Sequence, residues 1–145
     1  MRTKALVAAA AFLLAGVWAW QQRIVPDASA VPVQAGQDPA ATAFARRASG
    51  EWMYLQGKVE RILADDNDGS RHQRFILKTS EGHTVLVAHN IDVAPRLDGL
   101  RTGETLGVRG EYQWNELGGV MHWTHHDPHG QRQGGYIERM GRRYE

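Results

Sequence analysis

The sequence predicts a mainly β protein whose folded part is a small five-stranded barrel. From residue 51 onward, apolar and polar side chains alternate with a period of two, which is typical of half-buried strands. Turn residues separate the alternating runs, and a longer connector lies between the third run and the fourth. Three strands, a connector and two more strands form the element order of an OB-like Greek-key barrel. Another small barrel or an open meander is the alternative.

The first three strands are separated by two tight turns. Turn chemistry occurs at residues 67–69, Asn-Asp-Gly, and at residues 81–82, Glu-Gly. The second strand is expected at about 71–79 and the third at 83–89. The side chains expected to face inward are Leu55, Gly57, Val59, Phe75, Leu77, Val85 and Val87.

The last two strands follow a connector that begins at residues 90–95, where the alternation breaks and one short helical turn fits. The fourth strand, 105–114, has the clearest alternation, and a glycine-containing turn leads from it to a fifth strand that begins at Val120. Glycine inside a strand permits the sharp bends of a small barrel, which suits Gly57 and Gly110. A short final strand or docked tail is expected near residues 134–137.

The N-terminus has the pattern of an export signal. Arg2 and Lys4 precede an uncharged apolar run over residues 5–20, and a small-x-small site follows at 28–30. The run is slightly short for a membrane span of about 20 residues. Two interpretations stay open: a cleaved signal peptide, or a retained anchor that is the protein's contact with the inner membrane. Both predict a periplasmic or secreted location.

The expected organisation is therefore a signal or anchor helix over 1–30, a linker over 31–50, and an OB-like domain with a C-terminal tail over 51–145. The linker is rich in Ala, Pro, Gln and Gly, with a possible short helical stretch at 40–47. The absence of cysteine excludes disulfide and thiolate chemistry. After Ala30, fourteen basic residues stand against fifteen acidic ones. The basic excess typical of duplex DNA binding is therefore absent, although a local basic stripe is possible.

Residues 122–130 hold four of the seven histidines, together with Trp123 and Asp127. On a straight strand His122 and His126 would lie ~13 Å apart, so they could not bind one ion. A turn over 127–130, Asp-Pro-His-Gly, matches type I chemistry. Such a turn could bring His126, Asp127 and His129 together around a divalent metal such as zinc. The spacing nevertheless matches no standard zinc motif.

Structural roles for the same run are favoured for several of its residues. Trp123 can close the barrel core with Met121, packing against the neighbouring fourth strand. Asp127 can start the turn by accepting hydrogen bonds from its own backbone. The histidines can be simple solvated or hydrogen-bonded side chains. A cluster of loop histidines could also sense pH between 5 and 7.

OB-fold barrels bind oligonucleotides or oligosaccharides on the face of strands 2 and 3, flanked by the loops after strands 1 and 4. Arg74 and Lys78, with His72, are expected to face outward there, and Arg109 on the fourth strand. Outward aromatic residues are lacking on strands 2 and 3, and the aspartates of the first loop would repel phosphate. Single-stranded nucleic acid, an oligosaccharide or a protein partner therefore all remain candidate ligands.

The segment 57–135 also carries a recognisable set of motifs. They are a leading Gly-x-Val, a Leu-x-x-Gly-x-x-Leu-x-Val-x-Gly-x-Tyr segment ending at Tyr112, and the run Gly-Val-Met-His-Trp-Thr-His-His-Asp-Pro over 119–128. In these motifs the chain resembles a family of small exported bacterial proteins that form a domain of unknown function. The resemblance implies an exported location and a small β-barrel, and it implies no activity or catalytic residues.

These observations favour an exported OB-like binding module of the cell envelope with an unidentified ligand. The expected ligand-binding residues are His122, Trp123, His125, His126, Asp127, His129, Arg74 and Arg109. The alternative is a divalent-metal-dependent hydrolase such as a nuclease, in which a histidine beside Asp127 acts as general base. No serine or cysteine nucleophile lies in a recognisable motif, and no phosphate-cradling loop is present, so the binding module is preferred.

Overall fold

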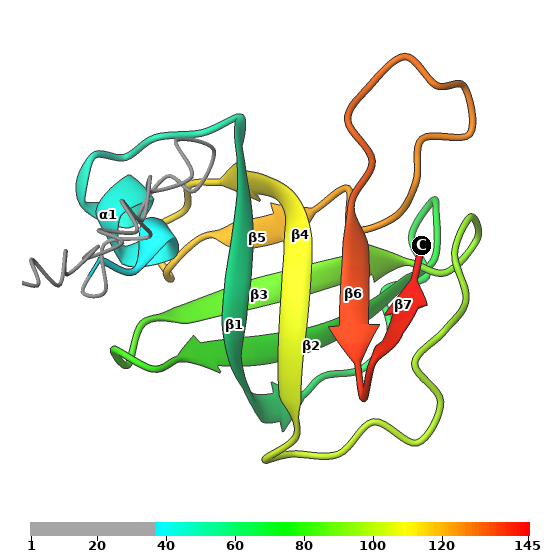
Figure 1. Ribbon diagram of the computed structural model, residues 1–145, viewed down its shortest axis with the longest axis horizontal. Coiled ribbons are helices and arrows are strands. Elements are labelled where there is room, and N and C mark those ends of the chain that lie inside the picture. Colours follow the sequence, from blue (N-terminus) through cyan, green and yellow to red (C-terminus); the bar gives the residue numbers. More distant parts are fainter. Residues whose placement is uncertain (1–36) are drawn as a thin grey trace, which may run out of the picture. The chain divides into compact units, whose positions relative to one another are not determined.

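The computed structural model describes residues 37–145 and has the predicted mainly β architecture, a closed five-stranded barrel with two extra strands (Figure 1). The elements are α1 (Pro39–Ala45), β1 (Glu51–Ile62), β2 (His72–Thr79), β3 (Thr84–Asn90), β4 (Thr105–Gln113), β5 (Val120–His122), β6 (Tyr136–Arg139) and β7 (Arg142–Tyr144). The expected signal or anchor over 1–30 lies outside the described residues. Among residues 37–145, no helix is long and apolar enough to cross a membrane.

The strand order around the barrel is β1-β2-β3-β5-β4, and β4 pairs with β1 to close it. All of these pairs are antiparallel except β3 with β5, which is parallel. This order confirms the OB-like Greek-key prediction. The long strand β1 pairs with β4 along its first part and with β2 along its second. Gly57 lies at this change of partner, where a Cβ atom would collide with the backbone carbonyl of Lys78.

The core follows the predicted alternation. The inward side chains of the five strands are almost fully buried, and Ile137 of β6 joins them. These buried strand residues are Leu55, Val59, Phe75, Leu77, Val85, Val87, Leu106, Val108, Tyr112, Met121 and Ile137. Burial of such apolar surface is the main stabilising contribution in a chain without disulfides.

Helix α1 packs against this core through Ala40 and Ala43, which are completely buried. It lies within the segment expected as a linker, where a short helical stretch was predicted. Asp38 caps the helix by accepting hydrogen bonds from the backbone N–H groups of Ala40 and Ala41. Its second carboxylate oxygen accepts a hydrogen bond from the Thr79 hydroxyl at the end of β2. The cap therefore also ties α1 to the barrel.

The fifth barrel strand is interrupted by an excursion of the chain. His122 of β5 lies opposite Glu111 of β4, and Tyr136 of β6 lies opposite Arg109, so both strands occupy the same edge of β4. The loop between them, residues 123–135, projects from the barrel as the orange segment in Figure 1. Trp123 has a φ of 53°, which ends β5 at His122. Trp123 and Thr124, which a regular continuation of β5 would include, therefore belong to the loop.

Candidate functional site

The histidine run lines a cavity at the break in the fifth strand. β5 pairs with β3 only at Leu86 and Val87, whereas β3 continues to Asn90. A cavity of about 360 Å³ lies beside the end of β3, within the usual size of ligand sites. We call it the histidine pocket. It is lined by Ser70, His72, Ala88, Asn90, Val93, His122, Trp123, His125, Asp127, Pro128 and His129.

A buried hydrogen-bond chain anchors the start of the loop. His89 Nε2 lies 3.0 Å from the Pro95 carbonyl oxygen, which can only accept, so we assign the ring proton to Nε2. Nδ1 then accepts a hydrogen bond from the Thr124 hydroxyl at 2.9 Å. Both side chains are completely buried. Burial lowers the pKa of His89 to about 4, so the ring is neutral near pH 7 and joins β3 to the loop.

Asp127 organises the interior of the loop. Its carboxylate accepts hydrogen bonds from the backbone N–H groups of His129, Gln131 and Arg132 at 3.0, 2.7 and 2.7 Å. The backbone N–H of Gly130 donates to the Asp127 carbonyl, closing the predicted turn. These backbone hydrogen bonds, that from His129 first, lower the pKa of Asp127. The expectation that Asp127 starts a turn is confirmed.

Trp123 forms one wall of the pocket and does not belong to the core. Its ring lies 5.3 Å from that of His125, and the Arg132 guanidinium lies over the indole at 4.7 Å. Met121, which precedes it on β5, is completely buried in the core. The expected packing of Trp123 in the core is therefore wrong, because the turn of the backbone at this residue directs the ring toward the loop.

His122, which lines the pocket, carries an unsatisfied polar atom. Within the described residues its Nε2 is buried and has no hydrogen-bond partner. Burial is also the main cause that lowers the pKa of His122, so the neutral ring is favoured. Buried polar side-chain atoms are normally hydrogen-bonded, and an exception calls for an explanation such as a bound molecule.

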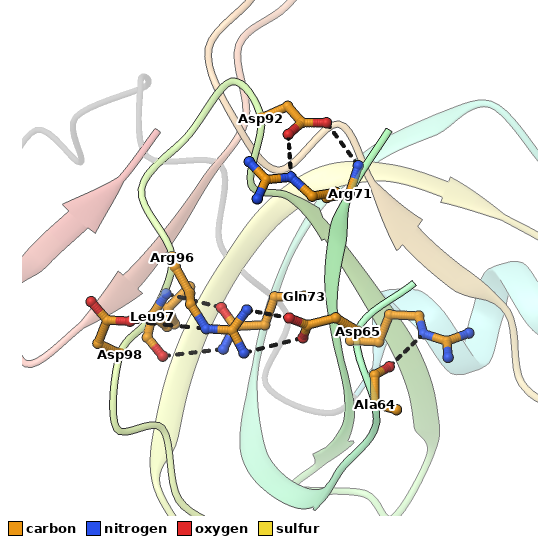
Figure 2. Close-up of polar contacts among 9 residues, drawn as sticks. Ala64, Asp65, Arg71, Gln73, Asp92, Arg96, Leu97 and Asp98 are labelled. Atoms are coloured by element: carbon orange, nitrogen blue, oxygen red, sulfur yellow. Dashed lines mark hydrogen bonds and ion pairs between the residues drawn. The ribbon is translucent and has the colours of Figure 1, made fainter. Parts of the chain in front are cut away.

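Two further loops that contribute to the pocket are joined to each other by polar contacts (Figure 2). Arg71 donates to Asp92 from both its backbone N–H and its Nε, at 2.8 and 2.7 Å. Arg96 forms an ion pair with Asp65. The Gln73 side chain, from β2, both donates to and accepts from the backbone of residue 97. These contacts fix the segments 63–71 and 91–98, which supply Ser70 and Val93 to the pocket.

The structure gathers five of the predicted site residues in the pocket and places three elsewhere. The five are His122, Trp123, His125, Asp127 and His129. His126 is exposed and does not line the cavity. Arg74 lies on the outer face of β2, where its Nε donates to the Ala64 carbonyl. Arg109 lies on β4 and donates to the Gly134 carbonyl and the Gln133 side chain, at the end of the loop.

The described part of the chain contains no group of three His, Cys, Asp or Glu side chains placed to hold a metal ion. The expected convergence of His126, Asp127 and His129 as a ligand set is thus not observed. His72 was expected only to face outward from β2, and the structure makes it a pocket residue. The strand alternation already indicated that His72 faces outward, whereas no local sequence pattern indicated that Ser70, Asn90 or Val93 would line a pocket.

Residues 24–145 match the model of one protein family, described as "Protein of unknown function (DUF3465)". No curated protein matches the chain.

Proposed function

The chain belongs to the DUF3465 family of proteins of unknown function, and from the geometry of its histidine pocket we propose that it is a binding module. The ligand occupies the pocket on the outer face of β2, β3 and β5. The observation that carries the proposal is a cavity lined by four imidazole rings and one indole on this face. We further propose that the module acts outside the cytoplasm, on the basis of the basic and apolar N-terminal pattern.

The place and the chemistry of the pocket support this function. Barrels of the OB type bind oligonucleotides and oligosaccharides on the face of strands 2 and 3. His72, Asn90 and His122 supply hydrogen-bonding groups to the wall, and Trp123 supplies an aromatic surface. A ligand with flat or ring-shaped units and polar edges fits such a wall. The hydrolase alternative has less support, because the Asp127 carboxylate is occupied by three backbone N–H groups.

The test is a titration of the full-length protein with a panel of oligonucleotides and neutral oligosaccharides, followed by histidine ring NMR. His129→Ala and His122→Ala should each weaken binding of the active ligand at least several-fold. His126→Ala is the matched control, since this neighbouring ring is exposed and outside the pocket. Equal affinity of all three variants for the ligand would contradict the proposal. So would a panel in which no member changes the NMR signals of the pocket histidine rings.

A further inference from the structure

A β-bulge in β1 places two cations on the same outer face of the barrel. The β1–β2 register pairs Lys58 with Lys78 and Val59 with Leu77, and after an irregularity at Glu60 it pairs Arg61 with Ile76. In a regular strand, residues three apart point to opposite faces. The bulge adds one residue and thereby turns Arg61 to the outer side, where Lys58 already lies.

Together with two cations of β2, these residues form a basic stripe, which we define as Lys58, Arg61, Arg74 and Lys78. Lys78 forms an ion pair with Glu60 at 3.2 Å. Among the described residues, the other three members have no acidic side chain within ion-pair distance. Lys58 and Lys78 lie directly opposite each other, an arrangement that is unfavourable for like charges. Glu60 already offsets the charge of Lys78, and a bound anion would offset the charges of the other three members.

The outward row of β2 connects the stripe to the histidine pocket. His72 lines that pocket, and Ile76 lines an apolar hollow of about 190 Å³ with Leu86 and Leu117. Lys78 lines a third hollow, of about 580 Å³, together with Lys58. The row from residue 72 to residue 78 spans ~20 Å at the rise of a strand. This length suits an extended ligand better than a single small molecule.

We infer that the ligand is a single-stranded nucleic acid, whose phosphates follow the basic stripe and whose end places a base in the histidine pocket. This inference rests on the proposed function. A positively charged track combined with ring-bearing side chains is the usual chemistry of single-strand binding. The acidic loop after β1, which holds Asp65, Asp66 and Asp68, opposes it less than its composition indicates, because Asp65 is neutralised by Arg96 (Figure 2).

The stripe carries no aromatic ring, so contacts along it should depend strongly on salt. For single strands, the logarithm of the affinity falls with the logarithm of salt with a slope of about −0.7 per phosphate contact. Four contacts give a slope of about −2.8, which is a roughly 50-fold loss of affinity between 50 and 200 mM salt.

The experiment is fluorescence anisotropy of full-length protein with labelled oligo(dT) of about 12 nucleotides, within the site size of one OB barrel. Lys58→Gln/Arg61→Gln should weaken binding roughly tenfold at 0.15 M salt and halve the salt slope. The control, Arg101→Gln/Arg142→Gln, removes the same amount of charge at positions away from the stripe. It should leave the affinity and the salt slope unchanged. If the first variant does not fold, Lys58→Glu alone provides the test and should weaken binding at least as much.

The outcomes separate this inference from the proposed function. Unchanged oligo(dT) binding by the stripe variant overturns the inference, even where His129→Ala weakens binding. Binding of a neutral oligosaccharide in the pocket without any oligo(dT) binding also overturns it, while the proposed function stands. Equal affinity for a sulfated polysaccharide overturns the assignment to nucleic acid. Absence of binding by every member of the panel overturns both proposals.

Discussion

Acid should destabilise the barrel in a pH range set by His89. The completely buried ring donates from Nε2 to Pro95 and accepts at Nδ1 from Thr124. A proton on Nδ1 would put a charge in the core and leave the Thr124 hydroxyl without its acceptor. The pKa of His89 is about 4 in the folded protein, against 6.5 for an ordinary histidine. As the pH falls, the unfolded chain therefore binds this proton before the folded chain does.

The sign and size of the effect follow from this difference in pKa. The contribution of His89 to the free energy of unfolding is fully present above pH 6.5. It decreases as the pH drops from 6.5 toward 4, and below pH 4 it decreases no further. At ~1.4 kcal/mol per pKa unit, the full loss is about 3 kcal/mol. Carboxylates contribute to the pH dependence of stability in a separate, lower pH range. The pKa of Glu104 is lowered, mainly by its hydrogen bonds with Arg139, so its contribution is lost only below the ordinary value of 4.5.

The assay is urea unfolding of the wild type and His89→Gln at several pH values between 7.5 and 4.5. Glutamine offers both a donor and an acceptor, so it can retain contact with Pro95 and Thr124 while removing the titration. We expect the variant to have a lower free energy of unfolding at pH 7.5 and a shallower loss of stability down to pH 5, since His122, whose pKa burial also lowers, still titrates in this range. Parallel profiles for the two proteins would refute this role of His89.

Three further perturbations test the packing around the site. Asp127→Ala removes the acceptor of three loop amides, so hydrogen exchange in residues 129–132 should accelerate while global unfolding changes little; unchanged protection would contradict this. Gly110→Ala brings a methyl group against the His122 carbonyl and should cost about 1–3 kcal/mol in urea unfolding. An unfolding midpoint equal to that of the wild type would contradict this, because it would show that β5 can shift without cost. Arg139, 14% exposed, donates four hydrogen bonds, whereas Arg46, 56% exposed, pairs with one carboxylate. Arg139→Gln should therefore lower the unfolding midpoint more than Arg46→Gln, and the reverse order would contradict that weighting of the contacts.

The barrel was predictable because each strand carries its own local signal. The alternation around Phe75 and Val87 assigns the inward face, and the connector after β3 gives the strand order. The side chains on that inward face, at every second position of the strand, are then the buried ones. The bulge at Glu60 has no such signal, since it depends on the pairing of β1 with β2. The outward position of Arg61 therefore could not be derived from the alternation.

The site was predictable in composition but not in geometry. The density of histidines marked the loop, and the turn chemistry of Asp127 was readable from its neighbours. The backbone turn at Trp123 depends on distant contacts, including the hydrogen bond from Gly135 back to His125. Arg109 also illustrates this limit, because β6 pairs with β4 beside it and draws its side chain to the end of the loop.

We propose that the break in the fifth strand creates the ligand site. The most direct measurement is a map of NMR shifts in full-length protein titrated with oligo(dT), including the histidine rings. We expect the largest saturable shifts at His72, His122 and His129, with smaller shifts along the outer face of β2. Shifts confined to the β6–β7 hairpin or to α1, with silent pocket histidines, would contradict the claim.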